Sequence, residues 1–243
     1  LVFWDNDVNL LSDITQLNLA LPSLLHTVAQ VRFTGEAGEC ALVTVGNPDA
    51  STTLLCVGVG AMSSLSQHSL SRSMAKAMQT AKKKKLSSLY CFYPDANSGI
   101  DWMHAVIYGA SLACYECHTY KSKTLPKQPF TGCVMHHVTQ DNDQARETLT
   151  QLDAVVSGQF LAKDLMHAPP NVLYPLAFAE RMQKLSQYGI SVTVLDEATL
   201  IKENMHALLA VGQGSTQPSA LCIMHWPGAG HDKSQSPIAL VGK

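Results

Sequence analysis

The chain has 243 residues, of which 46% are hydrophobic and only 15% are charged. This balance excludes an intrinsically disordered chain and a coiled coil, since both need far more charge and less apolar content. The net charge of −2 gives no reason to expect nucleic acid or an anionic membrane as a main partner, and no apolar run approaches the roughly 18 residues of a membrane span.

Short apolar runs alternate with helical patterns through the first part of the chain. Apolar β-formers predict strands over residues 40–45, 53–59, 89–93 and 130–138. Apolar residues at helical spacing predict helices over 65–85 and 100–120. Strands that alternate with helices of this length indicate an α/β fold with a mainly parallel sheet.

A long helical pattern begins at an N-cap signal near Asp141 and ends before the Pro169-Pro170 pair. At about 25 residues it is twice the usual helix length, which predicts a bridge between two domains. Further α/β elements follow it: a helix over 175–188, a strand over 190–195, a short helix from Asp196, and strands over 220–224 and 238–241. The predicted division is an N-terminal domain over 1–140, an interdomain helix over 141–167, and the start of a second domain over 168–243. The second domain is expected to be truncated, because its last predicted strand ends at the final residues of the chain.

Seven cysteines, an odd number scattered along the chain, indicate reduced thiols rather than a disulfide framework. The first seven residues lack the basic and apolar stretches of a signal peptide, although Leu1 in place of Met suggests a cut start. We therefore expect a cytoplasmic protein.

Residues Cys114 to His118 match the haem-attachment pattern C-x-x-C-H. Both cysteines fall on the apolar face of a predicted helix, and haem attachment would require export. A zinc site would need two more ligands, and the adjacent His136 and His137 would point to opposite faces of a strand. The sequence therefore predicts that Cys114 and Cys117 are buried, unligated thiols.

Two weaker patterns have ordinary structural interpretations. The four lysines at 82–85 could contact phosphate, but they also fit a solvated helix end, where cations are favoured by the helix dipole. Gly58-Val59-Gly60 begins a dinucleotide fingerprint that Ser63 leaves incomplete, so it is interpreted as a tight turn between strand and helix.

From about residue 158 onward the chain resembles the leucyl aminopeptidase (cytosol aminopeptidase) family. Three stretches carry the resemblance in family order and spacing: 162–175 (Ala-Lys-Asp-Leu-Met-His-Ala-Pro-Pro-Asn-Val-Leu-Tyr-Pro), 205–215 (Met-His-Ala-Leu-Leu-Ala-Val-Gly-Gln-Gly-Ser) and 237–243 (Pro-Ile-Ala-Leu-Val-Gly-Lys). Residues 57–60 and 115–122 are similar, more loosely, to the family's N-terminal domain. The chain departs from the family at His167, where Asn is usual, and at Asn204 and His206, where Gly is usual.

The resemblance implies a macro-domain-like N-terminal α/β domain and the opening βα units of an aminopeptidase catalytic domain. It implies a metal-dependent hydrolase that releases N-terminal residues, preferably Leu, from peptides and assembles as a hexamer. Two divalent metal ions, zinc or manganese, would polarise the scissile carbonyl. The family's lysine at the position of Lys243 ligates one metal through its neutral amine, whereas the remaining ligands and the catalytic residues follow beyond this position. This span alone is therefore expected to be inactive.

The residues themselves agree with that role for Lys243, because an ammonium that closes a buried apolar strand is costly and its pKa would fall. A lysine that extends from a strand end into solvent is the alternative. For the whole chain, the alternatives are a binding module with a macro-domain-like fold that takes ADP-ribose, and a non-catalytic relative used in assembly.

Overall fold

The computed structural model describes residues 1–12, 17, 19, 21–47, 50–93, 100–121, 133–138, 142–228 and 236–242. The chain divides into two compact units, residues 1–164 and 165–243, and each is described by itself. No described helix is both long and apolar enough to cross a membrane.

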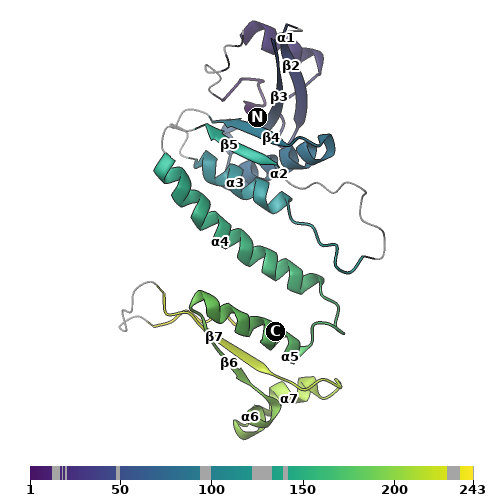
Figure 1. The fold of residues 1–243 in the computed structure, drawn as a ribbon, viewed down its shortest axis with the longest axis vertical. Helices are drawn as coiled ribbons and strands as arrows, with labels where there is room; N and C mark the ends of the chain where they lie inside the picture. Colours follow the sequence, from purple (N-terminus) through teal and green to yellow (C-terminus); the bar gives the residue numbers. More distant parts are fainter. Residues whose placement is uncertain are drawn as a thin grey trace. The chain divides into compact units, whose positions relative to one another are not determined.

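Unit 1 alternates strands and helices along the chain (Figure 1). Its elements are β1 (Val2–Asp5), α1 (Leu21–Gln30), β2 (Cys40–Asn47), β3 (Ala50–Gly60), a short 3-10 turn (Met62–Ser64), α2 (Gln67–Lys84), β4 (Ser88–Phe92), α3 (Trp102–Ala113), β5 (Val134–Val138) and α4 (Asn142–His167), whose last three residues belong to unit 2. The α/β class expected from the sequence is confirmed, although the sequence analysis missed β1 and α1.

The strands of unit 1 lie side by side in one twisted arrangement. β3 pairs in parallel with β1 and antiparallel with β2, and β4 pairs in parallel with β5. The backbone of Leu1 joins the two sheets, since its nitrogen donates to the Tyr90 carbonyl at 2.6 Å and its carbonyl accepts from Phe92 at 3.2 Å. The resulting order is β2-β3-β1-β4-β5. As expected from the sequence, most of the described ladders of unit 1 are parallel. The β2–β3 pair is antiparallel, because strands that follow each other this closely in the chain can only turn back as a hairpin.

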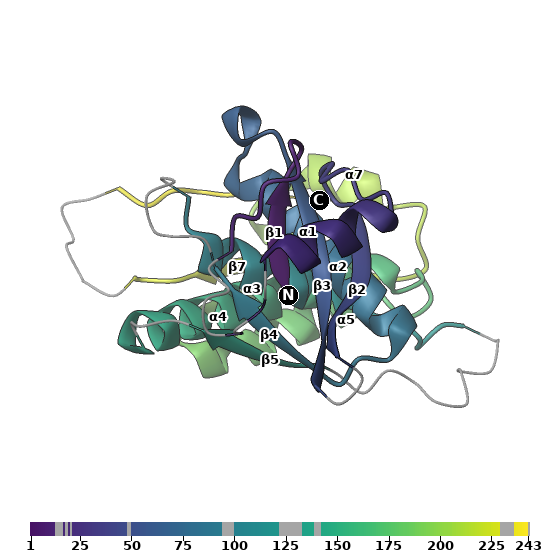
Figure 2. The ribbon, with the colours of Figure 1, turned by 90° about the horizontal axis from the view of Figure 1, so that it is seen from above.

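Helices cover both faces of these strands (Figure 2). On one side, α2 and α3 bury a cluster that includes Phe3, Val57 and Met74. On the other side, α1 buries a cluster that includes Trp4 and Leu24. Neighbouring residues such as Phe3 and Trp4 enter opposite clusters because successive strand side chains point to opposite faces.

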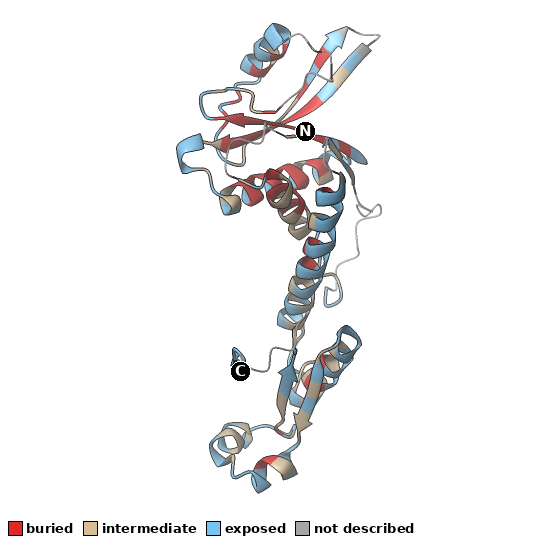
Figure 3. Ribbon diagram, turned by 90° about the vertical axis from the view of Figure 1, so that its left-hand side faces the viewer, coloured by how far each residue is buried: buried red, intermediate tan, exposed pale blue. Residues whose placement is uncertain are grey.

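Unit 2 contains fewer elements and fewer buried residues (Figure 3). They are α5 (Pro175–Gln183), a 3-10 turn (Lys184–Tyr188), β6 (Ser191–Leu195), α6 (Glu197–Lys202), α7 (His206–Gly212) and β7 (Leu221–His225), with β6 and β7 paired antiparallel. Pro175 occupies the first turn of α5, as its fixed φ favours.

The strand expected over residues 238–241 does not form. This segment has no regular secondary structure, and the side chains of Ile238, Leu240 and Val241 are more than 90% exposed. A strand is stable only when a neighbouring strand takes its backbone hydrogen bonds, and the described ladder of unit 2 pairs only β6 with β7. The apolar composition of the segment was therefore not sufficient to form a strand.

Candidate functional site

The predicted metal ligand, Lys243, lies outside the described residues. Within the described part of the chain, no three or more His, Cys, Asp or Glu side chains gather where they could hold a metal ion. A two-metal site needs several carboxylates, so the donor set described here does not fit such a site by itself.

The stretch 162–175 that resembles the family ends the long helix and begins the next one. α4 runs to His167, and the Pro169 carbonyl then accepts hydrogen bonds from the amides of Val172 and Leu173, each at 2.9 Å. This turn satisfies the backbone where the two prolines prevent the helix from continuing. The motif thus ends α4 and forms the turn that precedes α5.

The stretch 205–215 forms α7 and its C-terminal turn. A Cβ added at Gly212 would lie 2.0 Å from the Oγ of Ser219, a buried residue. The helix end and the segment before β7 thus approach closely, and a larger residue at position 212 would require the Ser219 side chain to move. Asn204, just before this stretch, has a φ of 59°, a left-handed conformation that glycine adopts without strain.

The turn expected at Gly58–Gly60 was wrong, because both glycines belong to the last residues of β3 and pair with β1. Their amides are engaged by the protein itself. The Gly58 amide donates to the Glu39 carbonyl at 2.9 Å, and the Gly60 amide donates to the Gly35 carbonyl at 3.0 Å. A Cβ at Gly58 would lie 2.2 Å from the Glu36 carbonyl oxygen. These glycines allow a loop to pack on β3, and their amides are not offered to a phosphate.

The prediction that Cys114 and Cys117 are buried was wrong. α3 ends at Ala113, Cys114 is exposed and Cys117 is half-buried, and both are free thiols. The helical pattern breaks because the next side chains have partners outside the helix: Glu116 pairs with α2 and Tyr115 packs on α4.

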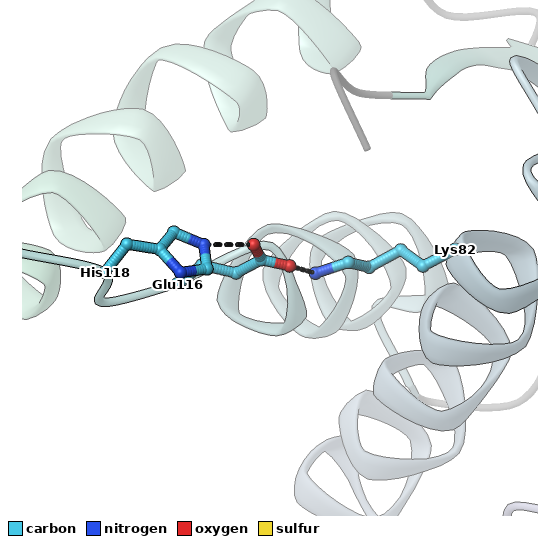
Figure 4. A network of polar contacts seen from close by, with 3 residues as sticks. All are labelled: Lys82, Glu116 and His118. Carbon is cyan, nitrogen blue, oxygen red and sulfur yellow. Dashed lines mark hydrogen bonds and ion pairs between the residues drawn. The ribbon is translucent and has the colours of Figure 1, made fainter. Parts of the chain in front are cut away.

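Glu116 lies between two basic side chains, as Figure 4 shows. One carboxylate oxygen pairs with the ammonium of Lys82 in the last turn of α2, and the other lies 2.7 Å from Nε2 of His118. The hydrogen bond from Lys82, with a smaller contribution from His118, holds the pKa of Glu116 below its usual range. The lysine run therefore is a solvated helix end in which Lys82 also ties α2 to the segment after α3.

Tyr115 attaches the same segment to α4. Its hydroxyl donates to Oδ1 of Asp164 at 2.9 Å, and its ring packs on Phe160 with centroids 5.1 Å apart. The ammonium of Lys163 lies 4.9 Å from the centre of the Tyr115 ring, at cation–π distance. Desolvation, together with the bond to Asp164, raises the pKa of Tyr115 to about 12. The contacts of Tyr115 hold the segment after α3 against α4, and they present no reactive side chain for catalysis.

His136 and His137 point to opposite faces of β5, as expected, and each stacks on a tyrosine. Tyr90 stacks on His136, with ring centroids 4.3 Å apart and planes 13° from parallel. Tyr93 stacks on His137 and its hydroxyl is hydrogen-bonded to Nδ1 of that ring. Burial, with a smaller effect of His136, lowers the pKa of His137. The two histidines were candidates from the sequence, whereas their aromatic partners were not predicted.

Comparison with known proteins gives two family matches in order along the chain. The model described as the cytosol aminopeptidase family, N-terminal domain, matches residues 5–124, and the model for the catalytic domain of the same family matches residues 160–243. Relatives named probable cytosol aminopeptidase in Caulobacter vibrioides and Agrobacterium fabrum are 30% and 33% identical over 91% and 85% of this chain. The chain covers 44% and 42% of these relatives, and so spans less than half of their length.

Two solved structures share the fold. A tomato leucine aminopeptidase mutant has a TM-score of 0.68 at 23% identity, over 86% of this chain and 41% of that one. The bottromycin maturation enzyme BotP in complex with Mn has a TM-score of 0.66 at 24% identity, over 81% of this chain and 41% of that one.

Proposed function

Because the chain belongs to the cytosol aminopeptidase family, we propose that it contributes the N-terminal domain, the interdomain helix and the start of the catalytic domain to a metal-dependent aminopeptidase. Such an enzyme would release N-terminal residues, preferably Leu, from peptides. The observation that carries the proposal is the catalytic-domain match over residues 160–243, which includes the stretch ending in Val-Gly-Lys. The three-part division at residues 140 and 167 is part of this proposal, as is assembly into a hexamer.

Lys243 is the one residue of this chain that we assign to the metal site. A lysine can ligate a metal only as a neutral amine, and a nearby dication lowers its pKa toward that form. Burial gives no support here, because the strand expected before Lys243 is absent and its apolar side chains are exposed. When bound, two divalent ions, zinc or manganese, would polarise the scissile carbonyl. The described residues supply no cluster of carboxylates for these ions, so we expect the 243-residue chain to be inactive by itself.

The test is hydrolysis of leucine p-nitroanilide with added manganese or zinc. Three proteins are compared. The first is the 243-residue chain, the second is a longer protein in which this chain continues through a complete catalytic domain, and the third is the longer protein with the substitution Lys243→Ala. Lys202→Ala in the longer protein is a matched control, because Lys202 ends α6 and is exposed. Bound metal is measured in parallel by elemental analysis, which reports on the ligand role without depending on turnover.

We expect turnover by the longer protein and by its Lys202→Ala variant only. Lys243→Ala should lose bound metal as well as activity. Turnover by the 243-residue chain would contradict the proposed incompleteness of the site, and undiminished metal content in Lys243→Ala would contradict the assignment of Lys243.

A further inference from the structure

The strand β5 lies at an edge of the sheet, where a single neighbour holds it. Within the described part of the chain, β5 (Val134–Val138) pairs only with β4. Two stacked ring pairs reinforce this pairing. Tyr90 stacks on His136 on one face of the strands, and Tyr93 stacks on His137 on the other. A short edge strand with one neighbour is the kind of element that can open locally while the rest of a domain stays folded.

The two histidines of β5 have different surroundings. His136 and its partner Tyr90 are exposed, so a charged His136 would stay in contact with water and would be favoured by the face of the tyrosine ring. His137 is half-buried and lies on the same side of the strand as Met135, which packs against the cluster under α2 and α3. A positive charge is therefore costly on His137 but not on His136.

The contact between Tyr93 and His137 fits a neutral imidazole. The rings lie 5.9 Å apart with planes 13° from parallel, and the Tyr93 hydroxyl is hydrogen-bonded to Nδ1 of His137. Burial raises the pKa of Tyr93, with smaller effects of Cys91 and Asp101, so the phenol keeps its proton. The hydroxyl can donate to Nδ1 only while that nitrogen carries no proton. A protonated ring would force the hydroxyl proton to turn away and lose this partner.

The helix α3 offers no negative charge to a protonated His137. Asp101 is used at the start of α3, where its carboxylate accepts a hydrogen bond from the His104 amide at 2.9 Å. The ring of His104 lies 3.2 Å from the side-chain amide of Gln67. His137 itself forms no ion pair with any carboxylate that the structure describes.

The other elements around β5 do not supply a counter-charge either. On β4, burial raises the pKa of the Cys91 thiol to about 12, so this group is neutral near pH 7. On β5 itself, His136 would repel a second positive charge. The charged residues in the first turns of α4, the helix that follows β5, are exposed: Asp143, Arg146 and Glu147.

We propose that β5 is an acid-sensitive strand, which opens from β4 when His137 takes up a proton. In the closed strand the ring is half-buried and neutral, whereas in the open strand it reaches water and can be charged. The closed form is therefore stabilised above the unfolded pKa of about 6.5, and this stabilisation is lost as pH falls from there through the lower folded pKa. Histidine is the side chain that changes its charge in this range.

Opening of β5 would loosen the strand that immediately precedes α4 in the chain. The proposal goes beyond the proposed aminopeptidase function and does not depend on it, since it involves only residues of unit 1.

Hydrogen exchange of single amides in the 243-residue chain, between about pH 7.5 and 5.5, measures the opening. The reporter is the Val134 amide, which donates to the Ser87 carbonyl at 3.0 Å, and the reference is the Gly58 amide in β3, which donates to the Glu39 carbonyl at 2.9 Å. Each rate is corrected for the pH dependence of exchange in an unprotected amide. Uptake of one proton permits up to about tenfold more opening per pH unit below 6.5. We expect the protection of Val134 to fall by up to about tenfold, and that of Gly58 to stay constant.

Three variants identify the group that titrates. His137→Phe keeps a ring that can stack on Tyr93 but cannot take up a proton, so the pH effect should disappear. His136→Phe makes the same change on the opposite face and is the matched control, which should retain the effect. Tyr93→Phe removes only the hydroxyl, so the pH effect should become smaller. In the unmodified chain, NMR titration of the imidazole signals should show His137 taking up its proton below the unfolded pKa of about 6.5.

Protection of Val134 that does not change with pH would overturn the proposal, as would an equal fall at Gly58, which would indicate global unfolding. An unchanged pH effect in His137→Phe, or its loss in His136→Phe, would also overturn it. If His137→Phe does not fold, the NMR titration still decides, because a His137 that titrates at or above the unfolded value in the folded chain contradicts the proposal.

Discussion

Gly109 in α3 lies directly against the carbonyl of Ser71 in α2, where an added Cβ would be 2.1 Å from the carbonyl oxygen. The obstacle is backbone, which cannot rotate away as a side chain can. Both residues are buried at the crossing of the two helices that cover one face of the sheet. The absence of a side chain at position 109 therefore sets how closely α2 and α3 approach.

We expect Gly109→Ala to lower the free energy of unfolding by about 1–3 kcal/mol, because the helices must separate to admit the methyl group. The same substitution at Gly158 in α4 is the matched control, since a Cβ there would meet nothing within 4 Å. Gly158→Ala should raise stability by up to about 1 kcal/mol through helix propensity alone. Urea unfolding of both variants measures the difference, and effects of the same sign would contradict this account.

The Glu116 ion pair should make stability depend on pH. Because Lys82 and His118 hold the pKa of Glu116 below its unfolded value, the unfolded chain binds the proton more readily. The stabilisation is thus present above the unfolded pKa of about 4.3 and is lost as pH falls through the lower folded pKa. The groups are partly exposed, so the contribution at pH 7 is expected to be no more than about 1 kcal/mol.

Glu116→Gln should therefore lower stability slightly at pH 7 and have less effect near pH 3. High salt should reduce the difference between variant and parent, as it screens a surface pair. Glu180→Gln, at an exposed position of α5, is the control and should show no such trend. Chemical unfolding at several pH values measures the effect, and an equal loss at pH 3 and pH 7 would count against the ion pair as its cause.

The spacing of apolar residues predicted correctly those helices whose ends are set by neighbouring residues, such as caps. The predicted helix over 65–85 corresponds to α2, where Ser66 caps the start and Lys85 adopts the left-handed conformation at the end. The same reasoning failed for α3, since the apolar spacing continues to Cys117 while the helix ends at Ala113. Its end is fixed by contacts to α2 and α4, and sequence spacing carries no information about such distant partners.

Sequence spacing is equally uninformative about which distant residues meet at the candidate site. The family motif predicted Lys243 as a metal ligand, which stays a prediction. A ligand set depends on residues brought together by the fold, and the described part of the chain gathers none. The Tyr90–His136 stack was also invisible, because it arises from the parallel pairing of β4 with β5. The sequence places Tyr90 and His136 on two strands and cannot give their register.

The cysteines should differ widely in reactivity. Burial raises the pKa of Cys56 and of Cys91 to about 12, whereas Cys114 is exposed after the end of α3. The thiolate is the reactive form, so Cys114 should be labelled by iodoacetamide well before the other two. Peptide mass spectrometry over time gives the order, and in denaturant all three should react at similar rates. Early labelling of Cys56 in the native chain would contradict its burial.

Asn204 and His206 offer a test of local backbone conformation, since they lie in the turn and at the helix start between α6 and α7. Asn204 has a φ of 59° between α6 and α7, and its amide donates to the Ile201 carbonyl at 3.0 Å. Asn204→Gly should retain or raise stability by up to about 1 kcal/mol, because glycine adopts this conformation without strain. Asn204→Ala should lower the stability by about 1 kcal/mol.

His206 begins the helix α7, so His206→Gly should instead be destabilising, by up to about 1 kcal/mol. Hydrogen exchange of the Met205 amide, which donates to the Leu200 carbonyl at 2.9 Å, reports on this turn directly. Opposite signs for the two glycine substitutions are expected, and a gain in protection from His206→Gly would show that the boundary between α6 and α7 is set by something other than the conformation of Asn204.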